Sequence, residues 1–285
     1  MKIWINGRLV APAEAKISVF DRGFMYGDGA FETMRAYAGV VFALDEHLRR
    51  VFSALKVLRI KPPYSKERLR GAVYNTLWAN KLYSAYIKLI ITRGEGRFGL
   101  AYKDISMPNV VVIAKNFEGY PEKMYERGIS AKITGVQNER SSIAGLKTLN
   151  YLPVIMARIH AKEGRFDDAI LENTEGKITE GATSNVFFVK KASLITPSPD
   201  SGVLPGITRD VIMDIARKSR IRVVEKDVSR RELLGSDEAF FTSSLAEVIP
   251  VTRIDSRRIG TGRVGDYTKF FRISYQKHII RHVLK

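Results

Sequence analysis

A single lysine stands among leucines in the stretch Gly145-Leu146-Lys147-Thr148-Leu149-Asn150-Tyr151, directly before an apolar run at 152–159. An unpaired ammonium group is costly to bury, so such a lysine must reach solvent, find a partner or lose its proton easily. A lysine whose pKa is lowered by its surroundings is a nucleophile and suits Schiff-base chemistry. The stretch therefore indicates either a reactive lysine or one that simply reaches solvent.

The length, composition and net charge of the chain limit the kinds of protein that it can be. Its 285 residues suit two modest domains or one large one. We expect no membrane span, because no run of eighteen apolar residues occurs, and no signal peptide, because residues 1–7 turn polar early. The absence of cysteine excludes disulfides and thiolate metal sites and favours a cytoplasmic location. The net charge of +17 is compatible with nucleic-acid binding, anionic substrates or a basic proteome.

Hydrophobic spacing and turn residues predict an α+β chain in two unequal parts. Predicted strands cover 2–5, 17–20, 86–92, 110–114, 129–133, 186–189, 194–196, 221–228 and 239–242, with hairpins over 30–43 and 167–179. Predicted helices cover 44–60, 65–81, the run up to about 162, 207–219 and the chain from 267 onward. The polar stretch 117–128 is predicted to link a small N-terminal domain, 1–116, to a larger C-terminal domain, 129–285.

Two later segments have the composition of a binding site. Ile178–Phe187 places one carboxylate, Glu180, at a predicted strand end before small residues, which allows a flat ligand to approach closely. Leu204–Asp210 is a glycine turn that leads into a helix, whose first free N–H groups and dipole attract an anion. Each segment alone is equally compatible with an ordinary surface turn or a capped helix.

Taken in this order, the three segments resemble the class IV (fold type IV) pyridoxal-phosphate aminotransferases. That family includes branched-chain aminotransferases, D-amino-acid aminotransferases and aminodeoxychorismate lyase. Two further stretches share the resemblance, which covers nearly the whole chain: Tyr26-Gly27-Asp28-Gly29-Ala30-Phe31-Glu32 and Glu46-His47-Leu48-Arg49-Arg50. The resemblance implies a two-domain fold like that of D-amino-acid aminotransferase, with a β-rich C-terminal domain. It also implies pyridoxal 5′-phosphate as cofactor and a homodimer in which the partner borders each pocket.

The resemblance also assigns roles around the cofactor. Lys147 would bind the cofactor aldehyde covalently and then act as the proton shuttle. Glu180 would face the pyridine nitrogen and keep it protonated, so that the ring can accept electrons. The phosphate would be bound by Arg50, the N–H groups of Ile207 and Thr208, and the hydroxyl of Ser244. Leu204 would pack against the ring and Tyr151 would lie beside its phenolate oxygen. These groups, far apart in the chain, are expected to converge on one ring.

The substrate pocket is predicted from position in the family to include Tyr26, Phe31, Thr33, Arg35, Tyr86, Lys88, Arg97 and Leu245. Branched-chain enzymes typically carry arginine where Lys88 stands, and lysine offers a point charge instead of a bidentate fork. Thr33, where these enzymes usually have glycine, and Ser243-Ser244-Leu245 are more similar to the lyase. Arg93–Leu100 and Asn150-Tyr151-Leu152 are more similar to the branched-chain members. Arg97 lacks the histidine two positions later that D-specific enzymes have.

Three other signals are weaker. Gly94-x-Gly96-x-x-Gly99 mimics a dinucleotide fingerprint, but the next residues lack a helical period. His278 and His282 are spaced to bind a metal, yet no acidic ligand accompanies them, so we expect no metal. Basic pairs and the basic C-terminal helix could contact nucleic acid.

We expect a transaminase acting on an apolar, branched-chain L-amino acid and 2-oxoglutarate. The alternatives are the lyase, a D-amino-acid aminotransferase and, in another class, a basic nucleic-acid-binding protein.

Overall fold

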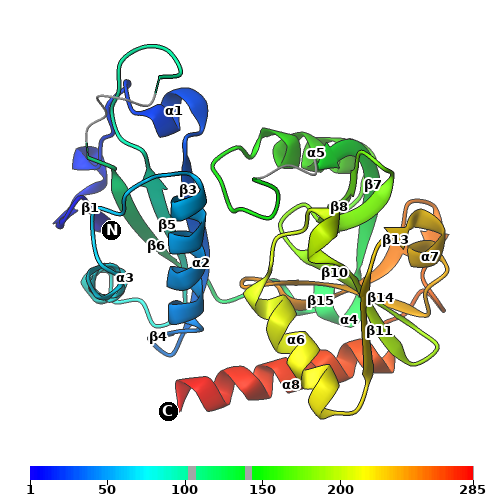
Figure 1. Cartoon of the computed structure of the whole chain (residues 1–285). Helices are drawn as coiled ribbons and strands as arrows, with labels where there is room; N and C mark the ends of the chain where they lie inside the picture. The colour runs from blue at the N-terminus through cyan, green and yellow to red at the C-terminus, as the bar shows by residue number, and fades with distance from the viewer. Residues whose placement is uncertain (102–106, 139–142, 285) are drawn as a thin grey trace. The chain divides into compact units, whose positions relative to one another are not determined.

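The computed structural model describes residues 1–101, 107–138 and 143–284 and divides the chain into two compact units. The first unit consists of Met1–Glu118 with Leu146–Asn150, and the second of Gly119–Gly145 with Tyr151–Lys285 (Figure 1). The lysine stretch thus belongs to the first unit, although the chain on both sides of it belongs to the second. The domain bounds that we drew from the sequence stay a prediction; within the expected linker, Glu122–Arg127 form a short helix, α4.

The first unit is built on an antiparallel sheet in the order β2-β1-β6-β5-β3-β4. Its strands are β1 (Ile3–Ile5), β2 (Arg8–Val10), β3 (Gly29–Tyr37), β4 (Val40–Val41), β5 (Ala85–Thr92) and β6 (Val110–Asn116). Asn6 and Gly7 both have positive φ in the turn between β1 and β2, the backbone that an Asn-Gly hairpin turn requires.

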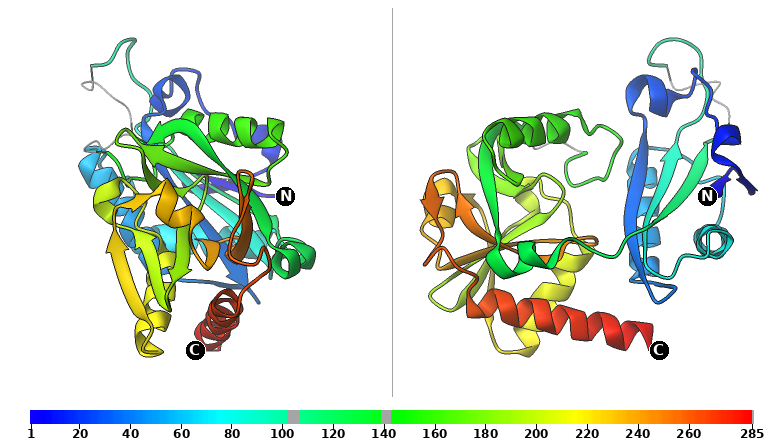
Figure 2. Two further views of the ribbon diagram at one scale, coloured as in Figure 1. Left: turned by 90° about the vertical axis from the view of Figure 1, so that its right-hand side faces the viewer. Right: turned by 180° about the vertical axis from the view of Figure 1, so that it is seen from behind.

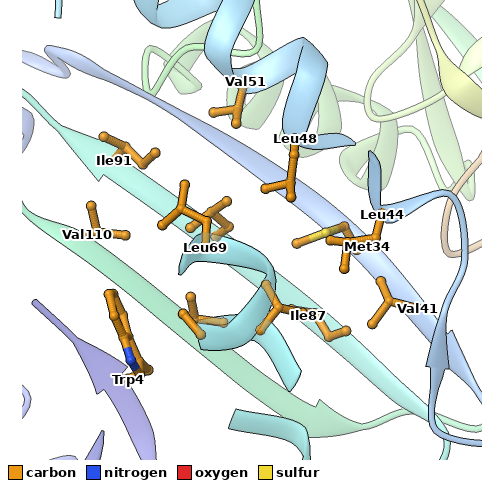
Figure 3. Close-up of a cluster of buried hydrophobic side chains, with 14 of the residues drawn as sticks. Trp4, Met34, Val41, Leu44, Leu48, Val51, Leu69, Ile87, Ile91 and Val110 are labelled. Atoms are coloured by element: carbon orange, nitrogen blue, oxygen red, sulfur yellow. The ribbon is translucent and has the colours of Figure 1, made fainter. Parts of the chain in front are cut away.

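One face of this sheet packs against helices α2 (Leu44–Val57) and α3 (Lys66–Ala79). Burial alternates along β5, where every second residue from Ala85 to Ile91 is buried and those between are partly exposed. Met34 of β3 and Ile87 of β5 meet Leu48 of α2 and Leu69 of α3 in the core (Figure 3). The strands therefore have a core face and a second face that is free to carry polar side chains.

The second unit is a mixed sheet in the order β12-β11-β10-β14-β15-β7-β8-β9-β13, with β16 paired to β15. Its strands are β7 (Ile129–Asn138), β8 (Asp168–Asn173), β9 (Lys177–Gly181), β10 (Asn185–Lys190), β11 (Ser193–Pro197), β12 (Arg222–Lys226), β13 (Val228–Ser229), β14 (Glu238–Ser243), β15 (Glu247–Ile254) and β16 (Arg257–Arg258). Its helices besides α4 are α5 (Leu152–Glu163), α6 (Ile207–Lys218), α7 (Arg230–Leu234) and α8 (Asp266–Val283). Helices α6 and α8 pack against each other and against the sheet (Figure 2).

The structure corrects two predicted strands. Residues 17–20 are not a strand, because Ser18 accepts from the N–H groups of Phe20 and Asp21 and closes a turn there. The hairpin partner of β1 is instead β2, which follows the Asn-Gly turn directly. The predicted strand 221–228 is broken at Asp227: β12 pairs with β11, whereas β13 pairs with β9.

Several elements were not predicted. Strand β15 contains Pro250, which lacks the N–H group that a strand interior normally uses, so the sequence disfavours a strand there. The short helices α1 (Arg22–Tyr26), α4 and α7 and the 3-10 turns Pro12–Glu14 and Pro199–Ser201 are too short for periodicity to reveal. None of the helices in the described part of the chain combines the length and hydrophobicity that a membrane crossing requires.

Candidate active site

The lysine stretch extends the sheet of the first unit beside the start of β3. The N–H of Phe31 donates to the carbonyl of Lys147 at 2.9 Å, and the N–H of Leu149 donates to the carbonyl of Gly29 at 3.1 Å. Ala30 and Thr148 thereby form an antiparallel bridge. Because side chains alternate along extended chain, buried Thr148 shares the core face with Ala30. Lys147 consequently lies on the opposite face, that of Phe31.

Five of the predicted substrate residues share this second face of the sheet. Thr33 lies opposite Lys88, and Arg35 lies opposite Tyr86, in the register of β3 with β5; Phe31 lies two residues before Thr33. Residues directly opposite each other in an antiparallel pair point to the same side. The register thus brings aromatic surfaces, a hydroxyl and two cations together on one face.

The amine of Lys147 lies over the ring of Phe31, with Nζ 4.8 Å from the ring centroid. The amine of Lys88 lies 4.6 Å from the same centroid. Burial, and then the positive charge of Lys147, lowers the pKa of Lys88 below its ordinary value. Both lysine amines therefore lie close to the buried ring of Phe31, and the charge of Lys147 affects the pKa of Lys88.

Arg50 is bonded to a carboxylate on the core side of the sheet. Its Nε and Nη2 atoms donate to the two oxygens of Glu32, both at 2.7 Å, and Nδ1 of His47 lies 2.8 Å from Oε2 of Glu32. Burial alone would raise the pKa of Glu32, but the hydrogen bonds from Arg50 and His47 outweigh it and lower that pKa to about 2. Burial lowers the pKa of His47, against the raising effect of the Glu32 carboxylate that its Nδ1 faces. Sequence reasoning gave Glu32 and His47 no role, although the alternation of β3 places a glutamate on its core face.

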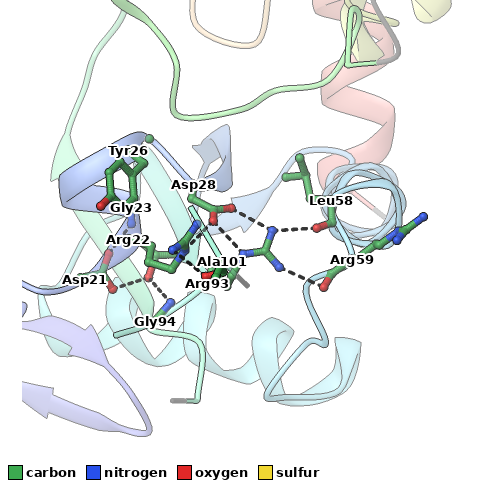
Figure 4. Close-up of polar contacts among 12 residues, drawn as sticks. Asp21, Arg22, Gly23, Tyr26, Asp28, Leu58, Arg59, Arg93, Gly94 and Ala101 are labelled. Atoms are coloured by element: carbon green, nitrogen blue, oxygen red, sulfur yellow. Dashed lines mark hydrogen bonds and ion pairs between the residues drawn. The ribbon is translucent and has the colours of Figure 1, made fainter. Parts of the chain in front are cut away.

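A second ionic cluster fixes the loop that carries Arg97. Asp28 accepts from Nε of Arg22 at 2.9 Å and from Nε and Nη2 of Arg93 at 2.7 and 2.9 Å (Figure 4). Nη2 of Arg93 also donates to the carbonyl of Leu58, and Nη1 of Arg22 donates to the carbonyl of Gly99.

The cluster joins the start of β3, the end of α2 and the loop after β5. Burial raises the pKa of Asp28, but the hydrogen bonds from Arg93 and Arg22 lower it by more. Tyr26 accepts from the N–H of Gly99 at 3.2 Å, whereas Arg97 itself is exposed. Residues 94–101 form an irregular loop instead of starting a helix, as a dinucleotide fingerprint would require.

In the second unit, Glu180 lies at the end of β9 and its carboxylate is held in place by hydrogen bonds. Oε2 accepts from the N–H of Leu204 at 3.1 Å and lies 3.5 Å from Nδ2 of Asn185. The same amide nitrogen of Asn185 donates to the carbonyl of Leu204 at 2.8 Å. Asn185, to which the sequence gave no role, therefore ties the glutamate to the turn that precedes α6.

Helix α6 begins at Gly206 in extended conformation, and no side chain among the described residues caps it. A Cβ at Gly206 would lie 1.9 Å from Oδ1 of Asn185, so a larger residue there would have to displace that amide. Ile207 and Thr208, the first residues of the helix, present their N–H groups there. The hydroxyls of Thr208 and Tyr275 lie 3.3 Å apart.

The other predicted residues of the second unit lie in turns. Ser244 and Leu245 lie in the turn between β14 and β15, and both are partly exposed. Tyr151 is the residue before α5, and its carbonyl accepts from the N–H of Ile155.

A separate groove on the first unit lies at the end of α2 and its turn to α3. It is floored by apolar residues such as Phe52 and Leu55. The cations lining it are Arg49, Lys56, Arg59, Lys61 and Lys66, and no carboxylate lines it among the described residues. We call it the basic groove; it contains none of the predicted site residues.

Comparison with known proteins identifies the family. The family model for amino-transferase class IV matches residues 29–254. A Methanocaldococcus jannaschii protein provisionally named branched-chain-amino-acid aminotransferase is 41% identical over 271 residues, 94% of this chain and 93% of its own. The D-alanine aminotransferase of Bacillus licheniformis is 34% identical over 285 residues, 100% of this chain and 99% of its own.

Solved structures of related enzymes have the same fold as this chain. A branched-chain amino acid aminotransferase of T.th., solved with pyridoxamine 5′-phosphate, has a TM-score of 0.92 at 31% identity, covering 97% of this chain and 93% of its own. The 4-amino-4-deoxychorismate lyase of Pseudomonas aeruginosa has a TM-score of 0.86 at 28% identity, covering 96% and 98%. The predicted fold type IV class and the predicted cofactor are confirmed by these matches. This chain is therefore a pyridoxal-phosphate-dependent enzyme that belongs to the class IV aminotransferases.

Proposed function

We propose that this enzyme transfers the amino group of a branched-chain or other apolar L-amino acid to 2-oxoglutarate. The observation that carries the proposal is the shared sheet face of Lys147, Phe31, Tyr86 and Lys88. Aromatic surfaces there suit an apolar substrate side chain, and the cation of Lys88 suits a substrate carboxylate. The branched-chain relative and the branched-chain structural neighbour described above support this choice.

The residues of the chain fit the cofactor. The start of α6 lacks a side-chain cap, and a Cβ on Gly206 would displace the amide of Asn185; a helix start with free N–H groups suits a phosphate. We assign the phosphate to the N–H groups of Ile207 and Thr208, the hydroxyl of Ser244 and Arg50. Leu204 would pack against the ring and Tyr151 would lie beside its phenolate oxygen.

When bound, pyridoxal phosphate supplies an aldehyde carbon that reacts with amines and a ring that accepts electrons released at the substrate Cα. The amine of Lys147 would hold that aldehyde covalently and, once released, move the proton at Cα. The carboxylate of Glu180 would keep the ring nitrogen protonated, and its hydrogen bonds from Leu204 and Asn185 fix its orientation. Lys88 would bind a substrate carboxylate as a point charge.

Two related activities are the alternatives. Thr33 and Lys88 depart from the branched-chain pattern in the direction of the lyase, which yields 4-aminobenzoate and pyruvate. A D-amino-acid aminotransferase is favoured by the full-length similarity to the Bacillus licheniformis enzyme but not by Arg97, which lacks the accompanying histidine. All three activities use the same cofactor.

Steady-state assays with L-leucine, D-alanine and aminodeoxychorismate distinguish the three activities. We expect the highest kcat/KM with L-leucine; pyruvate release from aminodeoxychorismate, or preference for D-alanine, would overturn the assignment. Borohydride reduction of the loaded enzyme, followed by peptide mass spectrometry, should leave the phosphopyridoxyl group on Lys147. Lys147→Ala should fold normally and lose turnover, and retained activity would contradict the role of this lysine.

We also propose a homodimer. Helix α5 exposes Leu152, Ile155, Met156 and Ile159, an apolar stripe with helical spacing. The first unit exposes a second apolar cluster, in which Phe20 and Phe98 meet edge to face at 5.7 Å. Exposed apolar patches of this kind are typical of protein interfaces. The cytoplasmic location expected from the sequence stays a prediction.

A further inference from the structure

The basic groove has the dimensions of a site for one small molecule. It lies at the end of α2, the turn that follows and the start of α3, and its volume is about 780 Å³. All of its lining residues lie within 49–66, so it belongs entirely to the first unit. Pockets that bind small molecules typically have volumes of about 300–1,000 Å³. The groove is therefore large enough for one such ligand.

The floor of the groove is apolar and continuous with the core of the first unit. Leu55 and Ile60 are buried in that core, and Phe52 packs against it while staying partly exposed. Nζ of Lys66 lies 5.5 Å from the centroid of the Phe52 ring, so a cation borders the floor. A ligand with an aromatic or apolar body would remove this surface from water.

The rim of the groove is positively charged. Its cations are all exposed and come from α2, the turn and α3: Arg49, Lys56, Arg59, Lys61 and Lys66. Arg49 pairs with Glu46 at 2.7 Å, and the other four have no ion pair within the described part of the chain. Glu67 follows Lys66 in α3 but does not line the groove. Like charges gathered in this way repel one another, and a ligand with several negative charges would relieve the repulsion.

The turn that carries part of the rim is fixed from the inner side. Nη2 of Arg93 donates to the carbonyl of Leu58 at 2.8 Å, and Nη1 donates to the carbonyl of Arg59 at 3.1 Å (Figure 4). The same guanidinium is held by Asp28. The groove is thus formed before a ligand arrives, which lowers the entropy lost on binding.

Cations around an apolar floor select the ligand by its chemistry. A phosphate chain carries several negative charges in a small volume, and both arginine and lysine bind it. A flat ring attached to that chain would cover the floor. Ser53, the uncharged polar residue of the lining, already donates to the carbonyl of Arg49 at 3.0 Å. The described lining therefore has little with which to distinguish one base from another.

We propose that the basic groove binds a nucleoside polyphosphate, with the phosphates on the rim and the base on the floor. A nucleic-acid chain offers the same base and phosphate chemistry, but the volume of the groove matches a single nucleotide. The groove contains none of the residues assigned to the cofactor or the substrate, so this inference does not depend on the proposed function.

The test uses the holoenzyme freed of unbound cofactor, so that the phosphate anchors of the active site are occupied. ATP is titrated by isothermal calorimetry without magnesium and at physiological salt, where long-range attraction between exposed charges is screened. We expect saturable binding at one site per chain. ATP should bind more tightly than adenosine or tripolyphosphate, the two halves of its chemistry, and UTP should bind about as well as ATP.

Charge reversal on the rim locates the site. The double variant Lys61→Glu, Lys66→Glu should weaken ATP binding by about tenfold or more. It should fold, because Lys61 is exposed in the turn and a glutamate at 66 suits the start of α3. Circular dichroism checks the fold, and the neutral pair Lys61→Gln, Lys66→Gln should weaken binding in the same direction. The matched control Lys16→Glu, Arg68→Glu changes the net charge equally at exposed positions outside the groove and should bind ATP normally.

Three results would overturn the inference. The first is the absence of saturable ATP binding, or equal ATP affinity in the rim variant and its matched control. The second is tripolyphosphate binding as tightly as ATP, because the apolar floor would then contribute nothing. The third is a short single-stranded oligonucleotide that binds more tightly than ATP and is weakened by the same rim variant, which would assign the groove to nucleic acid.

Discussion

Glu32 is a carboxylate in the interior of the first unit, and its stability contribution depends on pH. It is fully buried, and its oxygens are satisfied by Arg50 and His47. Removing one member of a buried ion pair leaves an uncompensated charge and typically costs about 3–5 kcal/mol. The pair also fixes Arg50, which we assign to the cofactor phosphate.

We predict an acid-induced loss of stability that depends on Glu32. Its pKa is lowered from 4.5 to about 2, so its contribution is fully present above pH 4.5 and is lost as the pH falls toward 2. A shift of this size corresponds to about 3 kcal/mol. Urea unfolding of wild type between pH 5 and 2 should show the loss, Glu32→Gln should show much less of it, and exposed Glu118→Gln should behave as wild type. Equal pH dependence in wild type and Glu32→Gln would contradict the prediction.

A second prediction concerns Glu180. Glu180→Gln should lower kcat by about a hundredfold or more, because a neutral amide cannot keep the ring nitrogen protonated. The variant should still bind the cofactor, since the α6 anchors remain, and absorbance of the purified protein would measure this. A variant with normal kcat would refute the assigned role, whereas one without cofactor would show that Glu180 is needed for binding.

Residue roles could be predicted from the sequence only in part. Motifs single out Lys147, Glu180 and the start of α6, because glycine turns and isolated charges are visible in one dimension. The bonds of Arg50 to Glu32 and of Asn185 to Glu180 were not predicted, because hydrogen bonds depend on which faces the strands present. The roles of these residues toward the cofactor stay predictions.

At the scale of elements, periodicity predicts the long, half-buried segments best. Strand β5 and helix α2 each have one apolar face, and both were predicted close to their observed bounds. Strand β15 was not predicted because a proline, Pro250, lies inside it and disfavours a strand. The wrongly predicted strand at 17–20 exposes both Val19 and Phe20, so its burial does not alternate. Which strands pair, and in what register, was not predictable because it depends on contacts distant in sequence.

The glycine before α6 gives a third prediction. Gly206→Ala should weaken cofactor binding by about tenfold, or about 1.4 kcal/mol, because its Cβ would displace Asn185 from the turn. Titration of the cofactor-free protein with pyridoxal phosphate measures this. Gly71→Ala is the matched control: it lies inside α3 with no atom within 4 Å of an added Cβ. It should bind normally and gain about 1 kcal/mol of stability; similar affinities for both variants would contradict the role of Gly206.

At the scale of the whole molecule, the apolar stripe of α5 makes the proposed dimer testable. Ile155→Asp places a charge in the middle of that stripe and should convert a dimer into a monomer by sedimentation velocity. Val57→Asp, which changes an exposed residue of α2, should leave the association unchanged. An Ile155→Asp dimer, or a monomeric wild type, would refute this interface.

The net charge of +17 is partly accounted for by location. Five cations line the basic groove, whereas Arg230, in the basic pair Arg230-Arg231, forms an ion pair with Glu172. Charge alone could not predict this, because composition does not say which cations have partners. Membership of the class IV aminotransferases gives no reason to expect nucleic-acid binding, which stays an untested alternative.

The edge of β3 has a consequence for how the protein is made. The first unit takes its last sheet partner from Leu146–Asn150, which a ribosome releases only after residues 119–145 of the second unit. Until then the nascent first unit carries an open strand edge at Gly29–Phe31, and such edges invite pairing with other chains. Synthesis halted before residue 146 would therefore leave an aggregation-prone fragment. Lys147, the residue proposed for the chemistry, also belongs to the segment that pairs with this edge of β3.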